Sequence, residues 1–132
     1  LERILNFFPD AAHKNVLMNL ALNLKAVVSQ RLVVGIDGRR LPAAEVLINT
    51  PHVRDLMRRG QVHEIKQAME ESLEEGMESF DQCLFRLYKE GRIAMEEALK
   101  AADSREGLAL KFRLSEGGTG EHDPYADVFA TH

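Results

Sequence analysis

The stretch AVVSQRLVVGIDGRRLPAAEVLI, residues 26–48, decides the fold of this chain. Its first part, Ala26–Val34, is rich in β-branched residues and predicts a strand. Residues 35–38 predict a turn with two glycines, and residues 39–48 predict a second strand with Pro42 at an edge or bulged position. Two paired strands are marginally stable alone in water, so the hairpin needs other elements to pack against.

Helical patterns flank the predicted hairpin on both sides. Residues 1–24 predict two helices that Pro9 separates. The first pattern begins at Leu1 without a cap, which indicates that an upstream part precedes it. After the hairpin, we expect helices over residues 50–59, 62–75, 79–90, 95–101 and 103–114, with Thr50, Ser79 and Asp103 as N-caps. The expected fold class is therefore α/β and mostly α.

Composition excludes several classes of function. The chain has 132 residues, a net charge of −4 and no Trp. It thus offers neither a basic field for nucleic acid nor many aromatic platforms for stacking on bases. Its apolar runs are shorter than the roughly 18–20 residues of a membrane span. We expect neither a nucleic-acid partner nor insertion into a membrane.

The sequence lacks the patterns of a self-contained catalytic site. Neither GxxxxGK(S/T) nor GxGxxG occurs in it. None of its five histidines is at metal-ligand spacing from another histidine or from the single cysteine, Cys83. Cys83 shares the apolar face of a predicted helix with Leu84 and Leu87, which favours a buried, unreactive thiol. We expect no catalytic, cofactor-binding or metal-binding residue within this chain.

One predicted helix carries charges that its own stability does not require. TPHVRDLMRR, residues 50–59, places Arg54 and Arg58 one turn apart on the same face. The other face is apolar and consists of Val53, Leu56 and Met57. Like charges at this spacing repel by about a few tenths of a kcal/mol. Such a pair suits a surface that meets carboxylates or phosphates, although a solvated basic face gives the same pattern.

The same segment resembles the AIRNLIRE motif of the type IV pilus retraction ATPases, the PilT and PilU proteins. Arg54, Leu56 and Arg58 match this motif directly, while Val53 and Met57 are conservative replacements. His52, Asp55 and Arg59 depart from it. Arg59 stands where the family has an acid, which puts an ion pair at that position in question.

Further strings in the same order extend the resemblance over nearly the whole chain, to about Leu114. They are LERILNFFP at residues 1–9, AVVSQRL at 26–32, GQVHEIK at 60–66 and GMESFDQCLFRLY at 76–88. VHEIK, SFDQ and the ADS at residues 102–104 are more similar to PilU than to PilT. Ala94 occupies a position where the family often has a Ser or Thr N-cap.

The resemblance implies two parts, and composition predicts a third. Residues 1–49 would be the last portion of a RecA-like P-loop ATPase core, and residues 50–114 a C-terminal helical domain. Residues 115–132 are glycine-rich and acidic, which predicts a disordered tail. The phosphate loop would lie upstream, so we expect no ATPase activity from this chain alone.

The resemblance also implies a cytoplasmic motor, peripheral to the inner-membrane pilus machine, that drives pilus disassembly and twitching motility. Such a motor hydrolyses ATP with Mg²⁺ as a hexamer, alone or beside a paralogous retraction ATPase, and works on the platform protein of the pilus machine. Val53, Arg54, Leu56, Met57 and Arg58 would form the motif that couples the nucleotide state to motion.

A second hypothesis remains open. The missing phosphate loop and the helix-rich second half also fit a free-standing interaction module that binds an acidic protein partner. Arg54 and Arg58 would then form one contact surface, and the tail another. Within the tail, Tyr125, Val128 and Phe129 would be a short docking segment.

Overall fold

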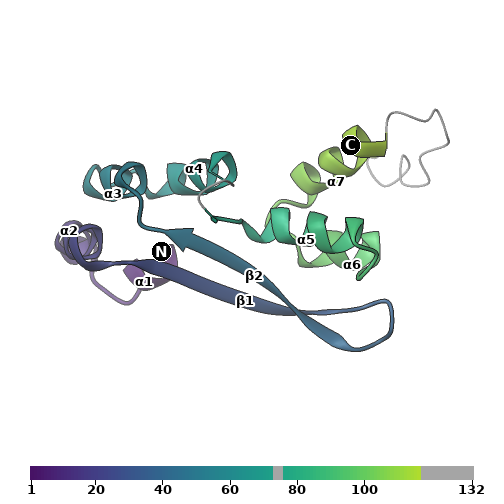
Figure 1. Ribbon diagram of the computed structural model, residues 1–132. Coiled ribbons are helices and arrows are strands. Elements are labelled where there is room, and N and C mark those ends of the chain that lie inside the picture. The colour runs from purple at the N-terminus through teal and green to yellow at the C-terminus, as the bar shows by residue number, and fades with distance from the viewer. Residues whose placement is uncertain (73–75, 117–132) are drawn as a thin grey trace, which may run out of the picture.

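A long antiparallel hairpin forms the spine of the molecule, and helices pack along one of its faces (Figure 1). The computed structural model describes residues 1–72 and 76–116. The elements, in chain order, are α1 (Glu2–Leu5), the 3-10 turn η1 (Asp10–Ala12), α2 (His13–Asn23), β1 (Ala26–Val34), β2 (Arg40–Ile48), α3 (Pro51–Arg58), the 3-10 turn η2 (Val62–Glu64), α4 (Ile65–Glu71), α5 (Phe80–Lys89), α6 (Met95–Ala101) and α7 (Arg105–Glu116).

The hairpin confirms the two predicted strands and their turn. The register runs without interruption from Ala26 opposite Ile48 to Val34 opposite Arg40. Pro42 lies opposite Leu32 in this register, so the edge alternative holds and the bulge does not occur. Side chains alternate between the two faces of the hairpin, so every second one points toward the helices. The residues on the opposite face of β1 are exposed.

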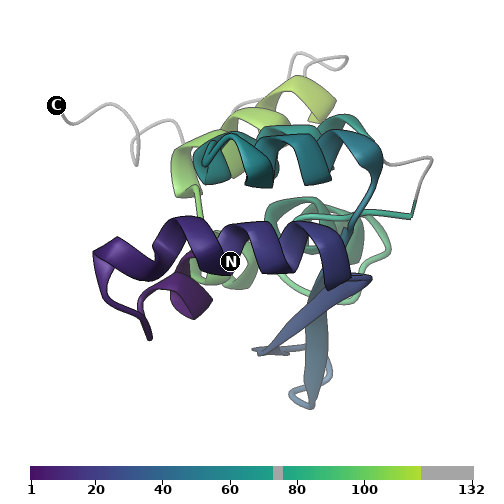
Figure 2. The same cartoon turned by 90° about the vertical axis from the view of Figure 1, so that its left-hand side faces the viewer.

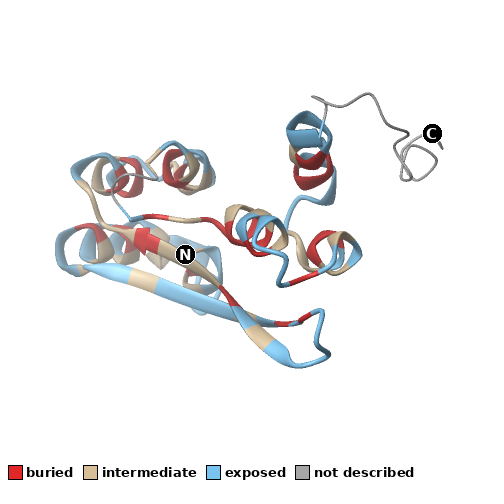
Figure 3. Cartoon of the chain, turned by 45° about the vertical axis from the view of Figure 1, so that its right-hand side comes forward, coloured by how far each residue is buried: buried red, intermediate tan, exposed pale blue. Residues whose placement is uncertain are grey.

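The buried apolar residues form two clusters. Figure 3 marks every buried residue of the chain in red. The first joins α1, α2, the end of β2, α3 and α4, with Leu17, Ala21, Leu47, Met57 and Met69 among its buried members. The second joins the far end of the hairpin to α5, α6 and α7, with Val33, Leu84, Ile93, Leu108 and Phe112 among its members. Both clusters draw on residues from either side of Asn49, and the division into domains at that residue stays a prediction.

The N-caps at Thr50 and Ser79 are confirmed. Thr50 Oγ1 accepts the N–H of Val53 at 3.3 Å, with Pro51 in the first helical turn. Ser79 and Gln82 form the predicted capping box. These caps could be predicted because the side chain and the backbone group it binds are only three residues apart.

The helix expected after Gln61 differs from the prediction at both ends. The expected helix over residues 62–75 is a 3-10 turn followed by α4, which ends at Glu71. The chain leaves the helix at Ser72 and returns to the sheet, where Glu78 pairs with Val46. Residues 73–75 lie outside the described residues.

The predicted cap at Asp103 is wrong, because the hydroxyl of Ser104 takes that place. Ser104 Oγ accepts the N–H of Gly107 at 3.2 Å, while the carboxylate of Asp103 is held by Arg31. Helix α7 continues through Ser115 and Glu116, two residues beyond the predicted start of the tail. The rest of the tail, residues 117–132, lies outside the described residues.

None of the helices described here is long and apolar enough to span a bilayer.

Candidate functional site

Helix α3 is anchored by its apolar face. Val53 and Met57 have no exposed surface, and Leu56 is only 4% exposed. All three belong to the first apolar cluster, together with residues of α2 and α4. Figure 2 shows α3 and α4 lying across α2, from which the hairpin departs. The rotation of α3 about its own axis is therefore fixed by packing, and so is the direction in which its polar side chains point.

The two arginines of α3 lie on its other side, as their spacing predicted. Arg58 is exposed and Arg54 is half-buried. Nε of Arg54 is buried and has no hydrogen-bond partner in the described part of the chain. Within residues 1–72 and 76–116, neither guanidinium group takes part in an ion pair or a side-chain hydrogen bond. A buried donor without a partner costs about 1–3 kcal/mol, so packing of this helix does not explain Arg54.

Asp55 and Arg59, two of the residues that depart from the AIRNLIRE motif, form an ion pair with each other. Arg59 Nη2 lies 3.0 Å from Asp55 Oδ2, and both side chains are about half exposed or more. Position 59 therefore takes part in an ion pair as the basic partner, with an aspartate one turn earlier, and not as the acid that the family has there. Such exposed pairs contribute only about 0.3–0.5 kcal/mol. The pair also occupies the carboxylate of Asp55, which leaves Arg54 and Arg58 without a neutralising group on α3.

Asn49 ties α3 to α2, and the sequence analysis missed it. Its Nδ2 donates to the carbonyl oxygens of Ala21 at 3.1 Å and Leu24 at 2.8 Å, which satisfies the C-terminal end of α2. Its Oδ1 is buried and finds no hydrogen-bond partner among the residues that the structure describes. An asparagine just before a Thr-Pro helix start was the only local signal, and it does not indicate a contact 25 residues away.

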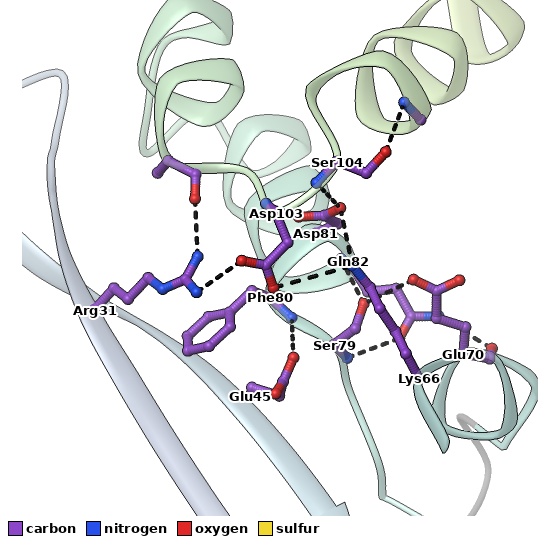
Figure 4. A network of polar contacts seen from close by, with 12 residues as sticks. Arg31, Glu45, Lys66, Glu70, Ser79, Phe80, Asp81, Gln82, Asp103 and Ser104 are labelled. Atoms are coloured by element: carbon purple, nitrogen blue, oxygen red, sulfur yellow. Dashed lines mark hydrogen bonds and ion pairs between the residues drawn. The ribbon is translucent and has the colours of Figure 1, made fainter. Parts of the chain in front are cut away.

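A polar network between the two apolar clusters was also missed (Figure 4). Arg31 of β1 pairs with Asp103 at 2.7 Å, donates to the carbonyl oxygen of Ala101 at 3.1 Å and lies 4.0 Å from the centre of the Phe80 ring. Lys66 of α4 approaches Asp81 at 3.7 Å and Asp103 at 4.0 Å. The network thus links β1 and α4 to the helices α5, α6 and α7.

Asp81 is the buried centre of this network. The residue is 4% exposed and lies in the first turn of α5. Its two carboxylate oxygens accept the backbone N–H groups of Asp103 at 2.8 Å and Ser104 at 3.0 Å. The loop between α6 and α7 is therefore held by one carboxylate.

Cys83 is buried, as predicted. Its residue is 2% exposed, and burial raises the pKa of the thiol, with the nearby Glu78 carboxylate adding to that effect. A thiol that resists ionisation is a poor nucleophile. Glu78 forms two hydrogen bonds with Arg86, at 3.1 and 3.0 Å, and thereby raises the pKa of that guanidinium.

The described residues do not fit ATP with Mg²⁺. No group of three or more His, Cys, Asp and Glu side chains in residues 1–72 and 76–116 is placed to hold a metal ion. At the start of α3, Thr50 caps the N–H of Val53 and Pro51 lacks an N–H, so neither position offers a backbone donor to a phosphate. A cavity of about 550 Å³ lies between α1, the inner face of the hairpin and α4, but its walls carry charges of both signs. Its polar lining includes Glu2, Ser29, Glu45, His63 and Lys66.

Comparison with known proteins identifies the family. No protein-family model matches the sequence. The type IV pilus ATPase PilU of Pseudomonas aeruginosa is 49% identical over 123 residues, which are 92% of this chain and 32% of PilU. The type IV pilus retraction ATPase PilT of the same organism is 33% identical over 102 residues, 77% of this chain and 30% of PilT. A crystal structure of the pilus retraction motor PilT with bound ADP superposes with a TM-score of 0.71 and 30% identity, covering 83% of this chain and 30% of that chain. This chain belongs to the type IV pilus retraction ATPase family.

The family match confirms the fold class expected from the sequence. The structure is mostly helical with a small sheet, and it superposes on part of the RecA-like PilT motor. The identity is higher with PilU than with PilT, as the short strings predicted. The chain spans about a third of the length of these relatives. A free-standing helical module is not favoured by these matches.

Proposed function

We propose that this chain is the portion of a type IV pilus retraction ATPase that converts nucleotide turnover into movement, with Arg54 and Arg58 as its contact residues. One observation carries the proposal. The apolar face of α3 is locked into the core, while both guanidinium groups on its other side lack partners among the described residues. Guanidinium groups held in this way can bind carboxylates with two parallel hydrogen bonds.

The neighbours of α3 give it a mechanical role. Asn49 binds the end of α2, and Val53 and Met57 pack in the cluster that α2 and α4 share. A shift of α2 would therefore carry α3 and its arginines with it. When bound, ATP with Mg²⁺ supplies the free energy of hydrolysis, and it would be held by residues outside this chain.

The proposal includes the wider setting of the motor. It would be a cytoplasmic hexamer at the inner-membrane pilus machine, working alone or beside a paralogous retraction ATPase and acting on the platform protein. Residues 1–49 would belong to its ATPase core and residues 50–114 to its helical domain. The names of the two Pseudomonas relatives and the ADP bound to PilT support the nucleotide-driven pilus motor within this setting.

Substitution of Arg54 in the full-length protein tests the proposal. Arg54→Ala and Arg58→Ala are expected to abolish twitching motility while leaving thermal stability and basal ATP turnover near those of the parent. Arg105→Ala removes an exposed arginine at the start of α7 and should leave motility unchanged. Arg54→Lys keeps the charge but loses the two-pronged geometry, so it should restore motility only in part.

The opposite results would count against a coupling role. Normal motility in the Arg54→Ala and Arg58→Ala proteins would show that these arginines are not needed. Loss of stability in proportion to loss of motility would assign them to folding.

The purified chain of residues 1–132 is expected to show no ATP turnover above a mock-purified control. Turnover that exceeds the control would show that the chain holds its own nucleotide site.

A further inference from the structure

The far end of the hairpin carries a basic and apolar surface. We define the hairpin-tip patch as Val34, Ile36, Arg39, Arg40 and Arg92. All five residues are exposed, with Ile36 at 66% and Val34 at 46%. The N–H of Ile36 donates to the carbonyl oxygen of Arg92 at 3.0 Å, which joins the hairpin turn to the loop between α5 and α6. Figure 1 shows this turn at the opposite end of the hairpin from α2 and α3.

The arginines of the patch are not neutralised by their surroundings. In residues 1–72 and 76–116, their three guanidinium groups form no ion pair and donate no hydrogen bond. The two nearby carboxylates are already engaged with backbone groups. Asp37 accepts the N–H of Arg39 and Glu97 accepts the N–H of Val34, each at 3.0 Å. Arg86, by contrast, has two carboxylates as partners.

The tail of the same chain has the complementary composition. Residues 121–129, EHDPYADVF, place the carboxylates of Glu121, Asp123 and Asp127 among Tyr125, Val128 and Phe129. These residues lie outside the described part of the chain. We propose that residues 121–129 dock on the hairpin-tip patch of their own chain, with the carboxylates on the arginines and the apolar side chains on Val34 and Ile36.

The end of α7 lies within reach of the patch. Glu116 Oε1 accepts the hydroxyl of Tyr88 at 3.0 Å, which places the last described residue beside the end of α5. Tyr88 and Arg92 are four positions apart, so their Cα atoms are at most about 15 Å apart. The linker before the docking segment, residues 117–120, is Gly-Gly-Thr-Gly and reaches about 14 Å. The N–H of Arg92 donates to the carbonyl oxygen of Leu87 at 2.9 Å, next to Tyr88, so the patch begins directly after α5.

The tether favours docking within one molecule. A short linker gives the tail an effective concentration in the millimolar range at the patch, which a second copy reaches only at similar protein concentration. Each exposed ion pair is weak by itself, so binding depends on several pairs acting with the apolar contact. The interaction should therefore weaken strongly with salt.

Paramagnetic relaxation in the whole chain, residues 1–132, tests this docking. Ala126→Cys places a spin label in the middle of the docking segment, and Cys83 stays unlabelled because it is 2% exposed. The amide resonances of Ile36 and Gly38 are expected to broaden at low salt, relative to the reduced label. Broadening should disappear at about 1 M salt, where the screening length is about 3 Å.

Charge reversal separates docking from nonspecific contact. Arg39→Glu with Arg40→Glu should abolish the broadening, and adding Asp123→Arg with Asp127→Arg should restore it. Arg3→Glu with Lys14→Glu reverses two exposed charges far from the tip and should leave it intact. Unchanged resonances of the two apolar clusters would show that each variant remains folded.

Three results would overturn the proposal. One is the absence of broadening at Ile36 and Gly38 at low salt. Another is broadening that survives both high salt and charge reversal. The third comes from a mixture of two chains, one isotope-enriched without a spin label and one spin-labelled without isotope enrichment. Equal broadening of the enriched chain would show that the tail binds a second copy.

Discussion

Replacing Asp81 with alanine is expected to destabilise the chain by about 3 kcal/mol. The carboxylate is 4% exposed and accepts the backbone N–H groups of Asp103 and Ser104. Hydrogen bonds to a charged group contribute about 1.5–3 kcal/mol each, and two that share one carboxylate are not fully additive. Lys66 would also lose one of its two nearby carboxylates, although this partly exposed contact adds little.

Urea denaturation of the chain provides the measurement. With a slope of about 2 kcal/mol per molar urea, the midpoint should fall by about 1.5 M while the slope stays the same. Asp81→Asn keeps one acceptor oxygen and loses the charge, so its midpoint should fall by about half as much.

Glu96→Ala is the matched control. Glu96 stands at the second position of α6, as Asp81 does in α5, but it is exposed and makes no side-chain hydrogen bond with the described residues. Its removal should cost only the interaction with the helix dipole, about 0.3–1 kcal/mol. If Asp81→Ala costs no more than Glu96→Ala, then the carboxylate of Asp81 does not hold the loop between α6 and α7.

Three further predictions concern local features. Ala94→Ser should raise the free energy of unfolding by about 1 kcal/mol in urea titration, because the N-cap of α6 has extended backbone and no side-chain cap; an unchanged midpoint would contradict this. Gly38→Ala should lower it by about 1–2 kcal/mol, because Gly38 has a φ of 80° in the hairpin turn; a neutral result would place the turn elsewhere. Burial raises the pKa of Cys83, so a thiol reagent should react only after unfolding. The contribution of the neutral Cys83 thiol to stability is full below the ordinary thiol pKa and is lost as the pH rises through the raised pKa. The Cys83→Ala protein should therefore lose less stability than the parent in that alkaline range. Rapid labelling of the folded chain would contradict the burial of Cys83.

The hairpin, most of the helices and the caps at Thr50 and Ser79 could be predicted because their causes are local. The β-branched run of β1, the glycine turn and the Thr50 and Ser79 caps each involve residues close in the chain. The apolar face of α3 also followed from helical spacing. Prediction failed at Asp103, where a local capping pattern competed with a distant arginine.

The strands, the helices and their apolar faces follow from the order of the residues alone, and so does the family, through its motif strings. The pairing of the polar groups follows only from the packed fold. Arg31 meets Asp103 across 72 positions, Asp81 holds a loop more than 20 residues away, and Asn49 closes the end of α2. A charged side chain meets such partners only after the strands and helices have packed. For the same reason, the structure alone shows that Arg54 and Arg58 are left without partners among the described residues.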